Sequence, residues 1–382
     1  MPVCSGMTDG EVQARVQAAI DRRVRDGSEV GLQVAVLRHG RVVVDAVAGH
    51  RDAERRHPVE PGTLFHAASA AKGIAATVAH VLVERGVAGY DLRVADVWPE
   101  FARHGKDQVT LRHILLHTAG VPAPPYDTTI EDLCDWDHMC RVLADTEPWW
   151  PAGTRFGYHA QTFGFLLGET VRRATGRTLS WWLRDTVTGP LGVVDEVHFG
   201  VPETLLSRVA YQHAANGAPV PQPPAGSPAD RANPPGIRPD ASRANRRDLL
   251  TAPIISSGTM SARGAARVYA ALLGHVDDVR LVSERRLREL ATVVYEGPDE
   301  VMDVPSAWAF GYSPARPGAV PSRPGSTFGM AGSNGSAAYA DIETGVAVAV
   351  MRNQVSPDWS AAAEIDGIIA DTISGDPPEE SS

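Results

Sequence analysis

Two segments rich in strand-forming residues lie at opposite ends of this chain, and they limit how it can fold. Residues 30–49 read VGLQVAVLRHGRVVVDAVAG, whose alternation predicts two strands paired as a hairpin around His39 and Gly40. Residues 335–353 read GSAAYADIETGVAVAVMRN, which predicts two further strands joined by a turn. We therefore expect an α/β (α+β) fold in which one antiparallel sheet is built from both termini, with a helical region inserted.

Helical periodicity and capping residues fill most of the sequence outside these strands. The expected helices span 9–26, 69–85, 110–120, 162–176, 261–275 and 359–373. We expect residues 1–66 and 252–374 to form an α/β domain around the sheet, and residues 67–251 to form a mostly helical domain. Residues 218–247 are rich in proline, lack periodicity and are expected to form a surface loop, and residues 375–382 a disordered tail.

Composition excludes several classes of function. A net charge of -10 without a basic stripe disfavours nucleic acid and anionic membranes as partners. The 3 cysteines form no CxxC pair, and the histidines show no ligand spacing, so we expect neither a metal nor another cofactor. The chain shows no long apolar run and no secretory signal at its start, which predicts a cytoplasmic protein without a membrane partner. The oligomeric state stays open.

One short stretch, HAASAAKGI at residues 66–74, points to chemistry. Ser69 and Lys72 stand three positions apart at the start of an expected helix, so both face the same side. Lysine occurs only here and at Lys106, whereas arginine is abundant. Lysine can act as a base once burial lowers its pKa, which arginine cannot do. The pair is therefore a candidate nucleophile with its base. Chance occurrence of Ser-x-x-Lys is the alternative.

Further motifs follow in a fixed order. GTLFHAASAAKGI is followed by LRHILLHTAGVP, WPAGTRFGYHAQTFGFLLGETVRRATGR, SSGTMSARGAARVYAALLG and FGMAGSNGSAAYADIETGVAVAVMRN. This series, over roughly residues 10–370, resembles the serine β-lactamase and penicillin-binding protein family. It is most similar to the class C-related branch with its family VIII esterases and acyltransferases. The resemblance implies a β-lactamase-like fold.

The same resemblance implies roles for individual residues. Ser69 becomes the acylated nucleophile, Lys72 its base, and Tyr158 a partner in proton transfer whose pKa would have to fall beside a cationic lysine. The backbone N–H groups of Ser69 and Ser333 become the oxyanion hole. Further candidate substrate contacts are Met330, Ala331, Gly332, His159 and Trp150, and packing in the aromatic core is the alternative for Trp150. His117 is expected to be structural.

Met330 is the main departure from the family pattern, which has a lysine or histidine at this position. A cation there can bind the carboxylate of β-lactams and of D-Ala-terminated peptides, whereas methionine is apolar. The departure favours uncharged ester or thioester substrates and disfavours β-lactamase or D,D-peptidase activity. Ala160 stands where many relatives have asparagine. Esterase-like members also have alanine at this position, which likewise disfavours penicillin recognition.

The sequence therefore predicts a serine acyl-enzyme hydrolase that acts on an ester, thioester or amide of a small molecule, of the carboxylesterase type. Two alternatives stay open. An alcohol or amine acceptor in place of water would make the chain an acyltransferase of secondary metabolism. Altered motif positions would also fit a binding protein that has kept the fold without the reaction. Motifs of other enzyme classes, GxSxG, HExxH, GxGxxG and the P-loop, do not occur.

Overall fold

The computed structural model describes residues 7–215, 222–314, 325–356 and 358–373. Its α-helices are α1 (Asp9–Arg25), α2 (Ala70–Glu84), α3 (Val94–Val97), α4 (Leu111–Leu115), α5 (Ile130–Cys134), α6 (Trp136–Asp145), α7 (Phe163–Thr175), α8 (Leu179–Leu183), α9 (Pro228–Ala232), α10 (Ala241–Ala244), α11 (Arg247–Thr251), α12 (Ala262–Leu273), α13 (Glu284–Ala291) and α14 (Ser360–Ile373). Short helices of other types are η1 (Pro99–Gly105), η2 (Arg184–Thr188), η3 (Glu203–Arg208), η4 (Pro235–Ile237) and η5 (Ile255–Ser257). The strands are β1 (Gly31–Arg38), β2 (Arg41–Gly49), β3 (Phe65–His66), β4 (Val197–His198), β5 (His213–Ala214), β6 (Thr259–Met260), β7 (Tyr295–Pro298), β8 (Pro305–Trp308), β9 (Thr327–Ala331), β10 (Ala337–Asp341), β11 (Val346–Arg352) and β12 (Gln354–Val355).

The main sheet joins the two ends of the chain. Its strand order is β2-β1-β11-β10-β9, and every neighbouring pair is antiparallel. The N-terminal hairpin meets the C-terminal strands where β1 pairs with β11, with Val34 opposite Val350. The hairpin turn has positive φ at both His39 and Gly40, which fits the right-handed twist of the strands it connects. The expected sheet from both termini is confirmed.

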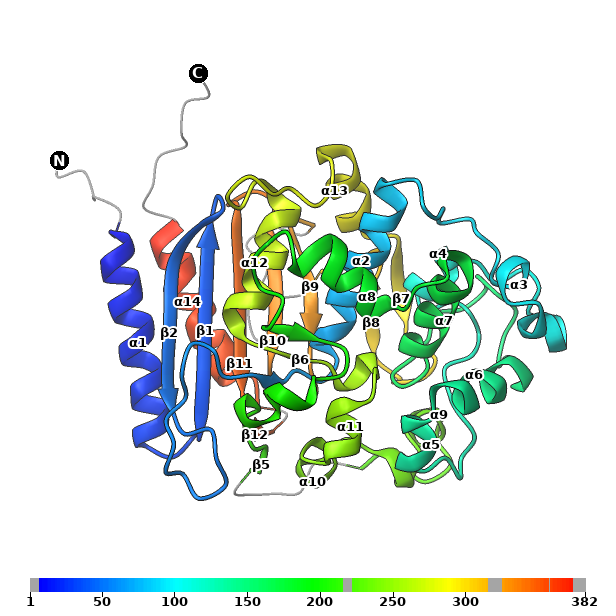
Figure 1. The fold of residues 1–382 in the computed structure, drawn as a ribbon, viewed down its shortest axis with the longest axis horizontal. Coiled ribbons are helices and arrows are strands. Elements are labelled where there is room, and N and C mark those ends of the chain that lie inside the picture. Colours follow the sequence, from blue (N-terminus) through cyan, green and yellow to red (C-terminus); the bar gives the residue numbers. More distant parts are fainter. Residues whose placement is uncertain (1–6, 216–221, 315–324, 357, 374–382) are drawn as a thin grey trace.

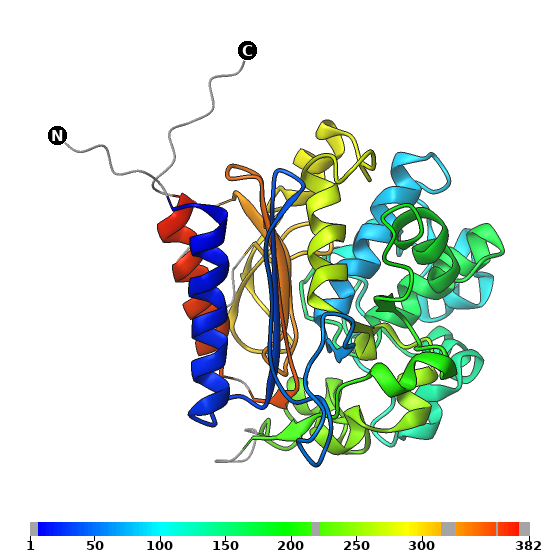
Figure 2. The same ribbon diagram turned by 60° about the vertical axis from the view of Figure 1, so that its left-hand side comes forward.

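Helices cover both faces of this sheet (Figure 1). In Figure 2, α1 and α14 pack side by side on one face, and α12 lies on the other, between the sheet and α2. Successive residues of β1 face opposite layers: Val34 and Val36 contact the α1–α14 side, and Ala35 belongs to the core under α12. Burial on both faces explains why β1 is apolar over nearly its whole length.

The larger hydrophobic core continues from the sheet into the helical region. Ala349 of β11, Ile74 of α2 and Leu166 of α7 belong to the same buried cluster. The division into domains at residues 66/67 and 251/252 stays a prediction.

Most of the expected helices form near their predicted bounds. Thr110 caps α4 through a capping box with His113, but α4 ends at Leu115 rather than near Gly120. Residues 218–247 were expected to form a surface loop without helices. In the part of this segment that the structure describes, three short helices occur: α9, η4 and α10. Ser227 and Asp240 cap α9 and α10. Single-turn helices show no sequence periodicity, which explains the error. The predicted tail, residues 375–382, lies outside the described residues.

Candidate active site

Ser69 lies at the N-terminus of α2, a helix whose residues from Ala70 to Leu82 are all buried. The preceding residue, Ala68, has a φ of 46°, a left-handed conformation that is strained for a residue with a Cβ. Although serine at this position often caps a helix, the Ser69 hydroxyl makes no capping hydrogen bond. The Ser69 Oγ is therefore available for another partner.

That partner is Lys72, one turn further along α2. Lys72 Nζ donates a hydrogen bond of 2.9 Å to Ser69 Oγ, and the lysine is only 1% exposed. Burial, with a smaller contribution from the positive charge of Arg243, lowers the pKa of Lys72 from its usual 10.5 to about 7. At neutral pH a large share of Lys72 is therefore the free amine, which can accept a proton from Ser69.

Tyr158 lies beside this pair. Lys72 Nζ is 5.2 Å from the centroid of the Tyr158 ring. The Tyr158 backbone N–H donates to Asp299 at 3.1 Å, and its ring packs against His117 with centroids 4.8 Å apart. Burial raises the pKa of Tyr158, although a hydrogen bond with Ser69 acts in the opposite direction. This shift is contrary to the fall that we expected, because the cost of burying a phenolate outweighs the hydrogen bond with Ser69.

The turn after β9 lies close to the segment that leads into Ser69. A Cβ on Gly332 would be 2.4 Å from the Ala67 carbonyl oxygen, so only glycine permits this approach. Asn334 Nδ2 donates to the His66 carbonyl at 2.8 Å and fixes the turn there. The backbone N–H groups of Ser69 and Ser333 make no hydrogen bond to any described residue. Two such free donors, beside one cavity, could bind an oxyanion.

The cavity has a volume of about 460 Å³. Ser69, Tyr158 and Ser333 line one part of it, and residues from 222–257 form much of the rest. The polar and charged residues of that second part are Gln222, Asn233, Arg238, Asp240, Arg243, Ser256 and Ser257. The sequence alone did not single out any of these, because proline-rich turns and one arginine among many carry no distinctive pattern.

The structure does not bring all the predicted contacts to this cavity. Met330 is 5% exposed and packs with Phe156 and Trp308 instead of lining it. His159 is buried, with Nε2 accepting from the Val121 N–H at 3.1 Å, and Trp150 lines a different surface pocket. Ala331 ends β9 and Gly332 makes the close approach to Ala67, so both shape the turn that carries Ser333.

His117 is buried and holds the Tyr158 segment. Its Nδ1 accepts a hydrogen bond from the His159 backbone N–H at 3.0 Å. Burial, with nearby His159 and Lys72, keeps its pKa well below the usual value, so the ring stays neutral. Within the described ranges no cluster of three potential metal ligands occurs, and no helix there is long and apolar enough to cross a membrane.

Fold and site together define a class: β-lactamase-like proteins with a serine–lysine pair at the start of a buried helix, beside a sheet edge. The profile of the family named Beta-lactamase matches residues 16–371. The chain belongs to this family, which confirms the resemblance read from its motifs.

Two relatives of the chain carry the name esterase. The chain is 32% identical over 345 residues to Esterase/beta-lactamase LipL of Mycobacterium tuberculosis, which covers 85% of this chain and 77% of LipL. It is 30% identical over 212 residues to Esterase EstB of Burkholderia gladioli, covering 51% of this chain and 53% of EstB.

Among solved structures, a family VIII carboxylesterase superposes with a TM-score of 0.85 at 30% identity, covering 94% of this chain and 97% of that one. A penicillin-binding protein homologue from Caulobacter crescentus gives a TM-score of 0.83 at 31% identity, covering 94% and 97%.

Proposed function

We propose that this protein is a serine hydrolase that cleaves small carboxylic esters through an acyl-Ser69 intermediate. The observation that carries the proposal is the 2.9 Å contact between Ser69 Oγ and a buried Lys72 whose pKa lies at about 7. The relatives named as esterases and the family VIII carboxylesterase structure support the same reaction.

Acylation starts when neutral Lys72 accepts the Ser69 hydroxyl proton and Oγ bonds to the ester carbonyl carbon. The backbone N–H groups of Ser69 and Ser333 hold the negative oxygen of the tetrahedral intermediate. Tyr158, kept as a neutral phenol by its raised pKa, donates its proton to the departing alkoxide, and the Lys72 ammonium returns a proton to Tyr158. The products of this half-reaction are the free alcohol and acyl-Ser69.

Deacylation repeats these steps with water as the nucleophile. Water attacks the acyl carbonyl, its proton passes to the Tyr158–Lys72 pair, and Ser69 leaves with a proton to release the carboxylic acid. An alcohol or amine acceptor in place of water would give acyl transfer. Both outcomes use the same small-molecule acyl donor, and acceptor-dependent decay of acyl-Ser69 distinguishes them. The cytoplasmic location stays a prediction.

Intact-mass spectrometry tests the proposal. The protein is mixed with short-chain 4-nitrophenyl esters, a thioester and a β-lactam, and its mass is followed with time. We expect one acyl group to be added at Ser69 from the esters, and the Ser69→Ala variant to remain unlabelled and inactive. Ser207→Ala, at an exposed serine outside the cavity, should label and turn over as the unsubstituted protein does. Equal ester turnover by Ser69→Ala would refute the proposal, and a fluorophosphonate that fails to label Ser69 would favour a binding protein.

A further inference from the structure

Arg243 of α10 lies in the wall of the active-site cavity, but it has no role in the reaction steps proposed above. The side chain lines the cavity together with Ser69 and Tyr158, and the residue is only 6% exposed. Arginine is almost never fully buried unless it is paired, since removing its charge from water is costly. The partners of Arg243 therefore decide what this residue does.

The protein supplies Arg243 with little compensation. Its Nη1 donates to the Ile237 carbonyl, and its Nη2 makes a long hydrogen bond of 3.4 Å to Gln161 Oε1. No carboxylate of the described residues lies within ion-pair distance of its guanidinium. A guanidinium has five N–H donors, so most of its capacity remains unused.

The acidic groups nearby are already engaged elsewhere. Asp240 accepts hydrogen bonds of 2.7 Å from the Arg243 backbone N–H and from the Ser242 hydroxyl, which makes it the cap of α10. Asp230 pairs with Arg238, the other arginine of the cavity wall. Arg238 is thus neutralised, whereas Arg243 forms no ion pair with any described residue and is attracted by Asp240 only from a greater distance.

The positive charge of Arg243 extends across the cavity. It contributes, after burial, to lowering the pKa of both Lys72 and His66. No negatively charged group of the described residues contributes to the pKa shift of Lys72 or of His66. An anion that enters the cavity would therefore meet a positive charge that Asp240 offsets only from beyond ion-pair distance, on a planar donor that matches a carboxylate.

We propose that Arg243 binds a carboxylate carried by the substrate, so that the natural ester is an anionic one such as a dicarboxylic acid half-ester. This proposal rests on the ester cleavage proposed above and names the substrate class of that site. It also revises the preference for uncharged substrates that Met330 suggested, because the positive charge comes from α10 instead of β9.

The test compares matched ester pairs that differ in one charge. 4-Nitrophenyl hydrogen adipate carries a carboxylate on the acyl chain, and its methyl ester is the uncharged control. 4-(Butanoyloxy)benzoate carries the carboxylate on the alcohol, with phenyl butanoate as its control. The ratio of kcat/KM between anionic and neutral esters is measured for the unsubstituted protein and for Arg243→Gln. A ratio cancels any change that affects both esters alike, including a change in the pKa of Lys72.

We expect the unsubstituted protein to prefer the anionic ester of at least one pair, and the pair that shows it locates the carboxylate. Arg243→Gln should lower that ratio by about 10- to 100-fold, the usual effect of losing a hydrogen bond to a charged group. Arg243→Lys should retain part of the preference. Arg25→Gln, which removes an exposed arginine on α1, should leave it unchanged.

Two results would overturn the proposal: no preference for the anion in either pair, or an unchanged ratio in Arg243→Gln. Failure of the proposed ester cleavage would look different, because neither the neutral nor the anionic esters would then acylate Ser69.

Discussion

At the scale of single residues, both lysines of the chain are buried, but their surroundings differ. Lys72 faces the Ser69 hydroxyl, whereas Lys106 Nζ donates to the backbone carbonyls of Arg103, Ala144 and Thr146 at 2.5 to 3.1 Å. The two lysines that stand out in the sequence are therefore both interior residues. Only the downstream motifs distinguished the catalytic candidate from the structural residue.

The buried amine of Lys72 should make stability depend on pH in a defined way. The pKa of Lys72 is about 7 in the folded protein and near 10.5 in the unfolded chain. Below pH 7 both states are protonated, and the folded state bears the whole cost of the buried charge. The cost shrinks as pH rises from 7 to 10.5, where the folded protein holds the neutral amine. Lys72→Met should therefore stabilise the protein by about 2–5 kcal/mol at pH 6, and by progressively less towards pH 10.

Urea unfolding of both proteins across this pH range measures that difference. Arg25→Met removes an exposed cation from α1 and should show no comparable trend. A stabilisation that does not change between pH 6 and 10 would contradict the lowered pKa.

At the scale of elements, two segments meet to make the site: the strained turn before α2 and the turn after β9. The bounds of α2 and α7 could be predicted because each has a long apolar pattern and a glycine at or just after its end. The cavity wall around Arg243 could not, because its single-turn helices are aperiodic and the place of its arginine depends on tertiary hydrogen bonds to Ile237 and Gln161. The order of the motifs predicted Ser69, Lys72 and Tyr158, whose roles stay proposals. It also suggested Met330 as a substrate contact, but Met330 packs against Phe156 and Trp308, because local sequence does not determine where a side chain points.

The close approach of the β9 turn to Ala67 leads to a prediction about Gly332. Gly332→Ala would place a Cβ 2.4 Å from the Ala67 carbonyl oxygen and 3.1 Å from the Ala68 Cβ, so the turn must move away. Ser333 would then carry its N–H away from the oxyanion, and kcat should fall by about 10- to 1,000-fold with a smaller change in KM. Gly89→Ala, where a Cβ meets nothing within 4 Å, is the matched control. Equal kcat values for the two variants would show that the turn does not position an oxyanion donor.

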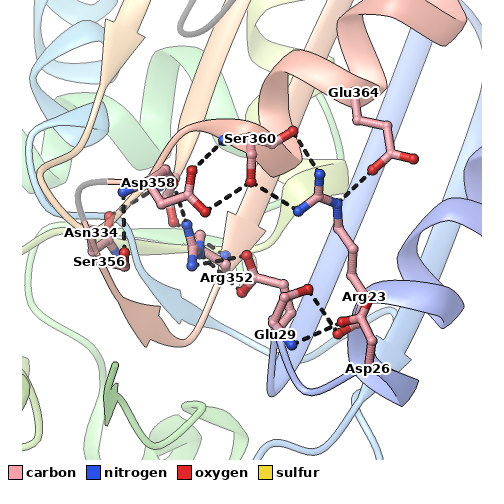
Figure 3. A network of polar contacts seen from close by, with 11 residues as sticks. Arg23, Asp26, Glu29, Asn334, Arg352, Ser356, Asp358, Ser360 and Glu364 are labelled. Atoms are coloured by element: carbon pink, nitrogen blue, oxygen red, sulfur yellow. Dashed lines mark hydrogen bonds and ion pairs between the residues drawn. The ribbon is translucent and has the colours of Figure 1, made fainter. Parts of the chain in front are cut away.

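At the scale of the whole molecule, the two ends of the chain are joined behind the site. Figure 3 shows Arg352, at the end of β11, between Glu29 and Asp358. Its guanidinium pairs with Glu29 at 2.8 Å and donates to the Asp358 carbonyl at 2.7 Å, and both members of the ion pair are 2% exposed. Its backbone N–H donates to Ser336 Oγ at 3.2 Å, so the same residue supports the turn that carries Ser333. The packing of α1 against α14 is thereby linked to the site.

The Glu29–Arg352 pair makes the molecule vulnerable to loss of one partner alone. Burial raises the pKa of Glu29 to about 7 even though Arg352 opposes the shift, so desolvation outweighs the attraction between the two charges. Arg352→Met would leave Glu29 buried without its partner and should destabilise the protein by about 3–5 kcal/mol at pH 8. The loss should shrink towards pH 5, because Glu29, with its pKa raised further, then takes up a proton in the folded state. Adding Glu29→Gln removes the unpaired charge and should recover much of the stability at pH 8. Urea unfolding of the single and double variants at both pH values measures these effects, and additive losses in the double variant would show that the two side chains are not coupled.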